Sequence, residues 1–133
     1  MAHIIIEFST NLEREHDITT LVDDVHRAAL ATEVFPLAGL RTRAHRCERF
    51  RVATGDEDLA FVAIVIRMGP GRSDEVKMQV ISRVLDAAES SLSGGGFHIS
   101  YSCEVQEIDA ARRENRNYIR SHLQGSDLQK EES

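Results

Sequence analysis

The sequence predicts one α/β (α+β) domain in which two β-α-β units form a single four-stranded sheet with two helices on one face. Two observations carry this prediction. Two amphipathic stripes with helical spacing each lie between apolar segments of strand length, and the two halves have similar lengths although their residues hardly match. Because such crossovers are nearly always right-handed, the strands of each unit should be parallel neighbours. The sheet face without helices should then contact other subunits.

The first half begins with a strand over residues 3–8, where three consecutive isoleucines are β-branched and too few for a helix. Asp17 is the expected N-cap of a helix that runs to about Thr32, and the segment 35–39 ends it. The apolar residues of this helix recur at helical spacing: Ile18, Leu21, Val22, Val25, Ala28 and Ala29.

Residues 41–52 should form a strand that is unusually basic for an acidic protein. One side of this extended segment carries Arg41, Arg43, His45, Cys47, Arg49 and Arg51. A turn at 54–58 follows. Residues 59–68 are then almost continuously apolar, which is typical of a strand covered on both faces.

The second half continues with a helix for which Ser73 is the expected N-cap. A glycine-rich loop over 90–96 leads to a strand over 97–107 in which apolar and polar residues alternate. The helical stripe consists of Val80, Ile81, Val84, Leu85 and Ala88, and the polar side of the strand carries His98, Ser100, Ser102, Glu104 and Gln106. We expect a domain over residues 1–124, with packing at 117–119, and a disordered tail over 125–133.

Composition excludes several classes of function. The 133 residues carry a net charge of −6, so nucleic acid is not an expected partner. No apolar run approaches the ~20 residues of a membrane span, and no signal peptide is apparent. Cys47 and Cys103 are interpreted as free thiols of a cytoplasmic protein. The six histidines show no zinc-ligand spacing, and neither a metal nor a cofactor is expected.

The early first strand raises the question of the N-terminal amine. An α-amine has an ordinary pKa of ~7.7–8.0, and burial or nearby cations lower it. An amine fixed by a strand could act as a general base or form a Schiff base. The simpler interpretation is a strand that merely begins early.

Two further features could bind anions. Guanidinium groups such as those of Arg41 and Arg43 bind carboxylates in a two-pronged geometry, although charge on an edge strand also prevents aggregation. The glycine-rich segment 69–73, which includes Arg72, opens into a helix N-terminus and is a generic anion site. It lacks the lysine and the spacing of a phosphate-binding loop, and it could be a simple connection.

These segments together resemble one family. The strand directly after the first methionine, the FPLAGLRTR segment at 35–43 and the GPGRS segment at 69–73 are similar to those of 5-carboxymethyl-2-hydroxymuconate delta-isomerases, which belong to the tautomerase superfamily. The resemblance runs from Ala2 to about Leu123. It implies the double β-α-β fold, a homotrimer, and isomerisation of an unsaturated keto acid with several carboxylates in aromatic catabolism.

The resemblance also implies site residues. In the family, removal of methionine exposes an N-terminal proline that moves a proton, while arginines hold the carboxylates and polarise the carbonyl oxygen. Arg41 and Arg72 match those arginines, and Arg43 is a further candidate for substrate binding. Where the family reads Met-Pro-His, this chain reads Met1-Ala2-His3. The catalytic amine would therefore be that of Ala2 after loss of Met1. A binding protein that lost catalysis, or a primary-amine catalyst of another keto-acid reaction, stays as an alternative.

Overall fold

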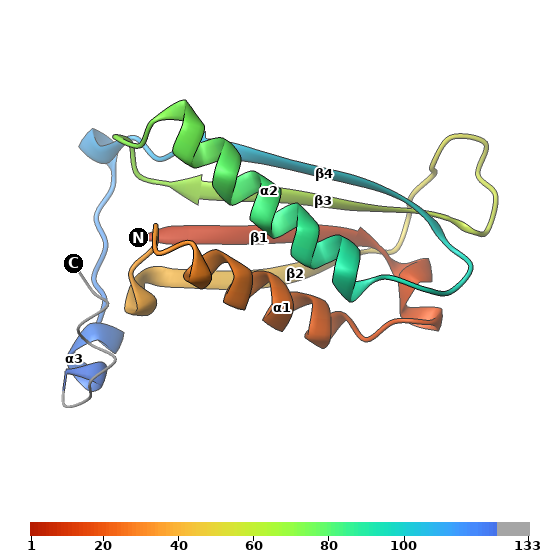
Figure 1. The fold of residues 1–133 in the computed structure, drawn as a ribbon, viewed down its shortest axis with the longest axis horizontal. Helices are drawn as coiled ribbons and strands as arrows, with labels where there is room; N and C mark the ends of the chain where they lie inside the picture. Colours follow the sequence, from red (N-terminus) through yellow and green to blue (C-terminus); the bar gives the residue numbers. More distant parts are fainter. Residues whose placement is uncertain (125–133) are drawn as a thin grey trace.

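The computed structural model describes residues 1–124 and shows one twisted sheet covered on one face by two helices (Figure 1). The strands are β1 (Ala2–Ser9), β2 (Leu40–Cys47), β3 (Leu59–Met68) and β4 (His98–Glu107). The helices are α1 (Ile18–Ala31), α2 (Asp74–Ser91) and the short α3 (Ile119–Leu123), with 3-10 turns η1 (Thr10–Arg14), η2 (Leu37–Gly39) and η3 (Ala110–Arg112). The predicted fold class is confirmed.

The strand order is β2-β1-β3-β4, which places the N-terminal strand in the interior of the sheet. β1 pairs in parallel with β2 and antiparallel with β3, while β3 and β4 are parallel. Each β-α-β unit therefore has the predicted parallel pair. Because the two units join through antiparallel β1 and β3, β1 begins at the end of the sheet where β3 and β4 finish (Figure 1).

Both predicted N-caps hold their helices. The Asp17 carboxylate accepts a hydrogen bond from the Thr19 backbone N–H at 2.9 Å, and the Ser73 hydroxyl accepts one from Val76 at 3.2 Å. These bonds satisfy donors that a helix N-terminus otherwise leaves without partners. The predicted stripes face the sheet, and their fully buried members are Leu21, Val25, Ala29, Val80, Val84 and Ala88. None of the helices in the described part of the chain is long and apolar enough to cross a membrane.

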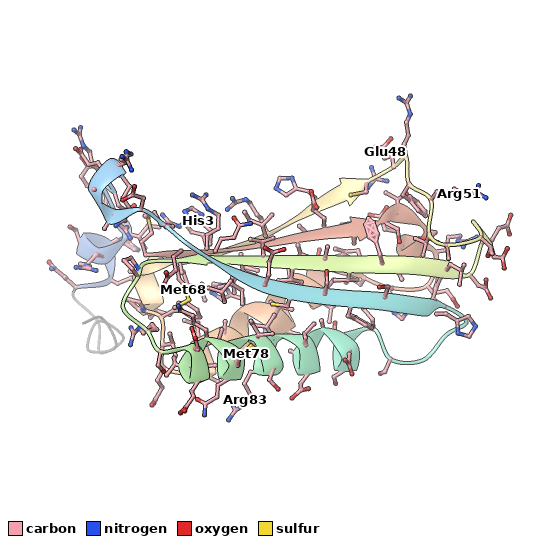
Figure 2. All side chains as sticks on the ribbon, turned by 90° about the horizontal axis from the view of Figure 1, so that it is seen from above. His3, Glu48, Arg51, Met68, Met78 and Arg83 are labelled. Carbon is pink, nitrogen blue, oxygen red and sulfur yellow. The ribbon has the colours of Figure 1, made fainter. Side chains whose placement is uncertain are left out.

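The sheet has one buried face and one partly exposed face. Alternate residues of β3, such as Val62 and Ile64, are fully or almost fully buried under the helices, while Phe61 and Val65 on the other face are only partly covered. Both long helices pack on one side, as predicted (Figure 1), so the single chain covers only one face of β3; cover of the other face by other subunits stays a prediction. Figure 2 shows this asymmetry, with His3 on the side away from the helices and Met68 on the side toward them.

The second strand ends earlier than predicted. β2 stops at Cys47 rather than Val52, and residues 48–58 form a loop at the far end of the sheet (Figure 1). The physical reason is the loss of its partner: Cys47 pairs with Ser9, after which β1 turns into η1. Ala53 in the loop has a left-handed backbone with φ of 49°, which a strand does not allow.

The segment after β4 crosses the end of the sheet where β1 begins (Figure 1). The Ile108 N–H donates to the Met68 carbonyl at 2.8 Å, and the Asn117 side-chain amide donates to the Ala38 carbonyl at 2.8 Å. Packing at 117–119 is thus confirmed for Asn117, whereas Tyr118 and Ile119 are 79% and 51% exposed. The tail predicted over 125–133 lies outside the described residues.

Candidate functional site

The N-terminus is fixed at the end of an interior strand. Ala2 is fully buried and pairs with Leu40 of β2 on one side and with Met68 of β3 on the other. Met1 lies against Gly39, where an added Cβ would stand 3.5 Å from both the Cα and the nitrogen of Met1. This separation is an ordinary van der Waals distance, so Met1 packs closely on this turn, and the pairing of Ala2 with both neighbouring strands holds the terminus in one place.

The amine lies in a strongly cationic setting. Burial lowers the pKa of the Met1 amine below its ordinary value of 8.0, and the charges of Arg113, Arg41, Arg120 and Arg72 lower it further. Both effects disfavour the protonated form. The arrangement therefore favours the free-base form of the Met1 amine and places it beside groups that attract anions.

Arg41 and Arg43 share the outer face of the sheet with His3. Nη2 of Arg41 lies 3.4 Å from Nε2 of His3, and Nη1 of Arg43 lies 3.1 Å from Nδ1. Burial and the charges of Arg41, Arg43 and Arg67 lower the pKa of His3, so the imidazole is neutral at neutral pH. A neutral imidazole has one acceptor nitrogen and can accept from only one of the two arginines.

Arg41 also carries an unused donor. Its Nε is buried and has no hydrogen-bond partner among the described residues. Burial and the nearby charges of Arg43 and Arg113 lower the pKa of Arg41 itself. The guanidinium is thus held among like charges with unsatisfied hydrogen-bonding capacity, a situation that a carboxylate ligand would relieve.

A cleft of about 420 Å³ lies between β2 and the C-terminal segment. Its size suits a small organic acid. Its lining residues are Arg41, Arg116, Asn117, Tyr118, Ile119 and His122. The cleft thus combines cations with exposed apolar side chains next to the fixed terminus.

Arg72 lies in the connection between β3 and α2. Its Nη2 donates to the Val34 carbonyl at 2.9 Å, which ties this connection to the segment after α1. Gly71 has a φ of 112°, a conformation that side chains rarely adopt, so glycine is required directly before this arginine. The predicted segment 69–73 therefore delivers a guanidinium to the same end of the molecule as the amine.

A second cleft, of about 550 Å³, lies at the other end of the sheet around Arg14, Arg46 and Glu57. Its cations already have partners: Arg46 binds Glu13 at 2.9 Å, and Arg14 donates to the Glu57 carbonyl at 2.7 Å. Arg116 of the 420 Å³ cleft is also paired, with Glu114, but Arg41 of that cleft has a buried Nε without a partner among the described residues, and we therefore place the candidate site there, near the N-terminus.

The structure brings together three of the predicted site residues, namely Ala2, Arg41 and Arg72, at one end of the sheet. Of the predicted site residues, Arg41 alone lines the 420 Å³ cleft; Ala2 and Arg72 lie at the same end outside its lining, and Arg43 shares a face with Arg41 and contacts His3. Sequence reasoning missed Arg113 and Arg120, because nothing in the polar C-terminal sequence indicates which end of the sheet it crosses. The antiparallel pairing of β1 and β3 brings the end of β4 beside the N-terminus, so knowledge of that pairing would have located both arginines near the amine.

Comparison with known proteins agrees with this geometry. The family model of 5-carboxymethyl-2-hydroxymuconate isomerase matches residues 2–123. A 5-carboxymethyl-2-hydroxymuconate Delta-isomerase of Escherichia coli is 39% identical over 110 residues, covering 81% of this chain and 87% of that protein.

Solved structures share the fold of this chain. A 5-carboxymethyl-2-hydroxymuconate isomerase from Deinococcus radiodurans R1 has a TM-score of 0.82 at 27% identity, covering 92% of this chain and 93% of that one. Another 5-carboxymethyl-2-hydroxymuconate delta-isomerase, at 21% identity, has a TM-score of 0.83 with the same coverage of both chains. The chain belongs to the 5-carboxymethyl-2-hydroxymuconate isomerase family of the tautomerase superfamily.

Proposed function

We propose that this protein is an isomerase that moves a proton along an unsaturated keto acid of the 5-carboxymethyl-2-hydroxymuconate type, in the breakdown of aromatic compounds. The observation that carries the proposal is the chain terminus fixed at the start of β1 among arginines, a setting that, together with burial, lowers the pKa of the Met1 amine. The kinship with the E. coli Delta-isomerase supports the substrate class.

The roles follow from the chemistry of the groups. After removal of Met1, the free-base amine of Ala2 takes a proton from one position of the conjugated substrate and returns it to another. Negative charge develops on the carbonyl oxygen in between, and guanidinium groups stabilise that charge. Arg41 and Arg72 serve this purpose and bind the carboxylates, with Arg43 as a lesser contributor. The substrate's atoms are conserved, and no oxidant or second reactant is needed.

Alanine at position 2 sets this chain apart from the family pattern. The Ala2 amine is primary, so it can act as a base, and with a carbonyl it forms an imine rather than the charged iminium that proline gives. Because the amine is primary, a second candidate function is catalysis of a different keto-acid reaction through an imine. Trapping by borohydride in the presence of a keto acid distinguishes an imine-forming enzyme from a simple base.

We further propose that the working form is a homotrimer. The support is the outer face of the sheet, where apolar side chains such as Phe61 and Val65 are only partly covered in the single chain. Apolar side chains left partly uncovered on a sheet face are commonly covered by another subunit.

The direct test is turnover of a 2-hydroxymuconate-type substrate, followed by its ultraviolet absorbance, with the purified protein whose mass shows the loss of Met1. Arg41→Gln serves as the site control. The proposal predicts turnover that the Arg41→Gln variant loses. Absence of turnover in the processed parent, together with unchanged carboxylate binding in the variant, would favour a binding protein with its pocket elsewhere.

A further inference from the structure

We propose that Arg113, from the segment that follows β4, is a third carboxylate-binding arginine of this site and selects substrates with an additional carboxylate. The inference rests on the proposed function, since it assigns a specificity residue to the same site. Arg113 lies outside the segments 35–43 and 69–73, from which the sequence predicted the other arginines of the site.

The position of Arg113 is the first argument. Its Nη2 lies 3.2 Å from the Sδ of Met1, so the guanidinium reaches the residue that covers Ala2. The segment that carries it is anchored on both sides, by Ile108 on the Met68 carbonyl and by Asn117 on the Ala38 carbonyl. Arg113 is thus held over the terminus from a different element than Arg41 or Arg72.

The partners of the neighbouring arginines are the second argument. Arg112 forms an ion pair with Asp109, and Arg116 forms one with Glu114. In the described range 1–124, Arg113 has no carboxylate within ion-pair distance, and its side-chain partner is a thioether, a weak acceptor. The local sequence therefore neutralises the arginines on either side and leaves the one that faces the terminus without an anion.

Removal of Met1 gives this arrangement its function. The thioether leaves with the residue, and the Arg113 guanidinium then faces the newly exposed amine of Ala2. Arg113 is the largest charge contribution to the lowered pKa of the terminal amine, ahead of Arg41, which agrees with its proximity. A substrate that extends from the cleft at Arg41 into the space vacated by Met1 meets Arg41 from β2 and Arg113 from the C-terminal segment. Two carboxylates on different arms then have separate partners.

The test compares two probes that differ by one carboxymethyl arm. Trans-aconitate is an unsaturated tricarboxylate, and fumarate is the dicarboxylate that lacks this arm. Binding of each is measured by titration calorimetry with the full chain after mass spectrometry confirms the loss of Met1. The variants are Arg113→Gln, Arg113→Lys and Arg41→Gln, and Arg112→Gln is the matched control, because Arg112 is adjacent, has the same charge and is paired with Asp109.

Arg113→Gln should weaken trans-aconitate about tenfold or more while leaving fumarate within about twofold. Arg113→Lys should restore part of the loss, Arg112→Gln should bind both probes like the parent, and Arg41→Gln should weaken both. A role of Arg113 in folding alone would weaken both probes equally and lower Tm. The pKa of the terminal amine, followed by NMR, should also rise in Arg113→Gln and stay unchanged in Arg112→Gln.

The outcomes separate this inference from the proposed function. If Arg41→Gln loses binding while Arg113→Gln binds both probes like the parent, the role of Arg113 is overturned and the proposed site survives. If the processed parent binds neither probe, the proposed function and the role of Arg113 both fail.

Discussion

Replacing Arg41 by glutamine should remove carboxylate binding without unfolding the protein. Arg41 lines the 420 Å³ cleft, its Nε is buried without a partner, and its described side-chain bond is the 3.4 Å contact to His3. A hydrogen bond to a charged group contributes about 1.5–3 kcal/mol, and about 1.4 kcal/mol corresponds to tenfold in affinity. One lost bond therefore predicts a loss of about 10-fold to 100-fold, and a two-pronged contact predicts more.

Stability should move little in the same variant, since the substitution takes one cation away from a crowded group. The pKa of Arg41 is lowered in the fold by burial and by Arg43 and Arg113, so the fold does not favour its charge. The assay is titration of trans-aconitate together with thermal unfolding. Arg27→Gln, an exposed helical variant, is the control. Affinity equal to that of the parent would refute the location of the site, and a large fall in Tm would refute the claim that Arg41 serves binding rather than folding.

Three further predictions concern the same site and its assembly. Arg72→Gln should weaken carboxylate binding while the helix content by circular dichroism stays unchanged, because Ser73 rather than Arg72 caps α2; loss of helix would contradict this. Deprotonation activates the amine, and the exposed Ala2 amine would stand in the cationic setting that lowers the pKa of the Met1 amine from 8.0, so kcat/KM should rise with pH and be half-maximal below pH 8; a half-maximal pH of 8 or above would contradict that setting. Light scattering at micromolar concentration should give the mass of a trimer, and a monomer would remove the proposed subunit interface.

The parts of the fold that could be predicted from the sequence are those fixed by local pattern. The helices have a 3.6-residue apolar period and a side chain suited to the N-cap, so their beginnings at Asp17 and Ser73 followed from the residues alone. The strand over 59–68 was equally plain from its apolar run, although the cover of its outer face was not, because the single chain supplies helices to one face alone.

The parts that could not be predicted depend on partners distant in the sequence. The end of β2 at Cys47 is set by where β1 turns away, and nothing in residues 48–52 records that. The C-terminal segment has no periodic pattern, since single polar bonds such as that from Asn117 to Ala38 hold it. Arg113 lies near the site because the antiparallel pairing of β1 and β3 brings the end of β4 beside the first residue.

Some residues of the candidate site could likewise be predicted from the sequence, and others could not. Arg41 and Arg72 followed from guanidinium chemistry and from a resemblance of short segments, and both lower the pKa of the terminal amine in the structure. His3 lies between Arg41 and Arg43 for a reason of register, since His3 pairs with Arg41 across the first two strands. A histidine at the third position carries no such signal by itself.

The most direct test of the account is the activity of Ala2→Pro. If the binding groups and geometry are in place and the N-terminal amine is the base, a secondary amine at this position should raise proton transfer on a 2-hydroxymuconate-type substrate. A positioned general base typically contributes 10²–10⁴-fold over a site without one, so turnover by the variant should lie well above assay noise. Mass spectrometry must show that Met1 is gone, and light scattering must show the oligomer of the parent. A processed, correctly assembled Ala2→Pro protein that stays inert would contradict the central claim and favour a binding protein.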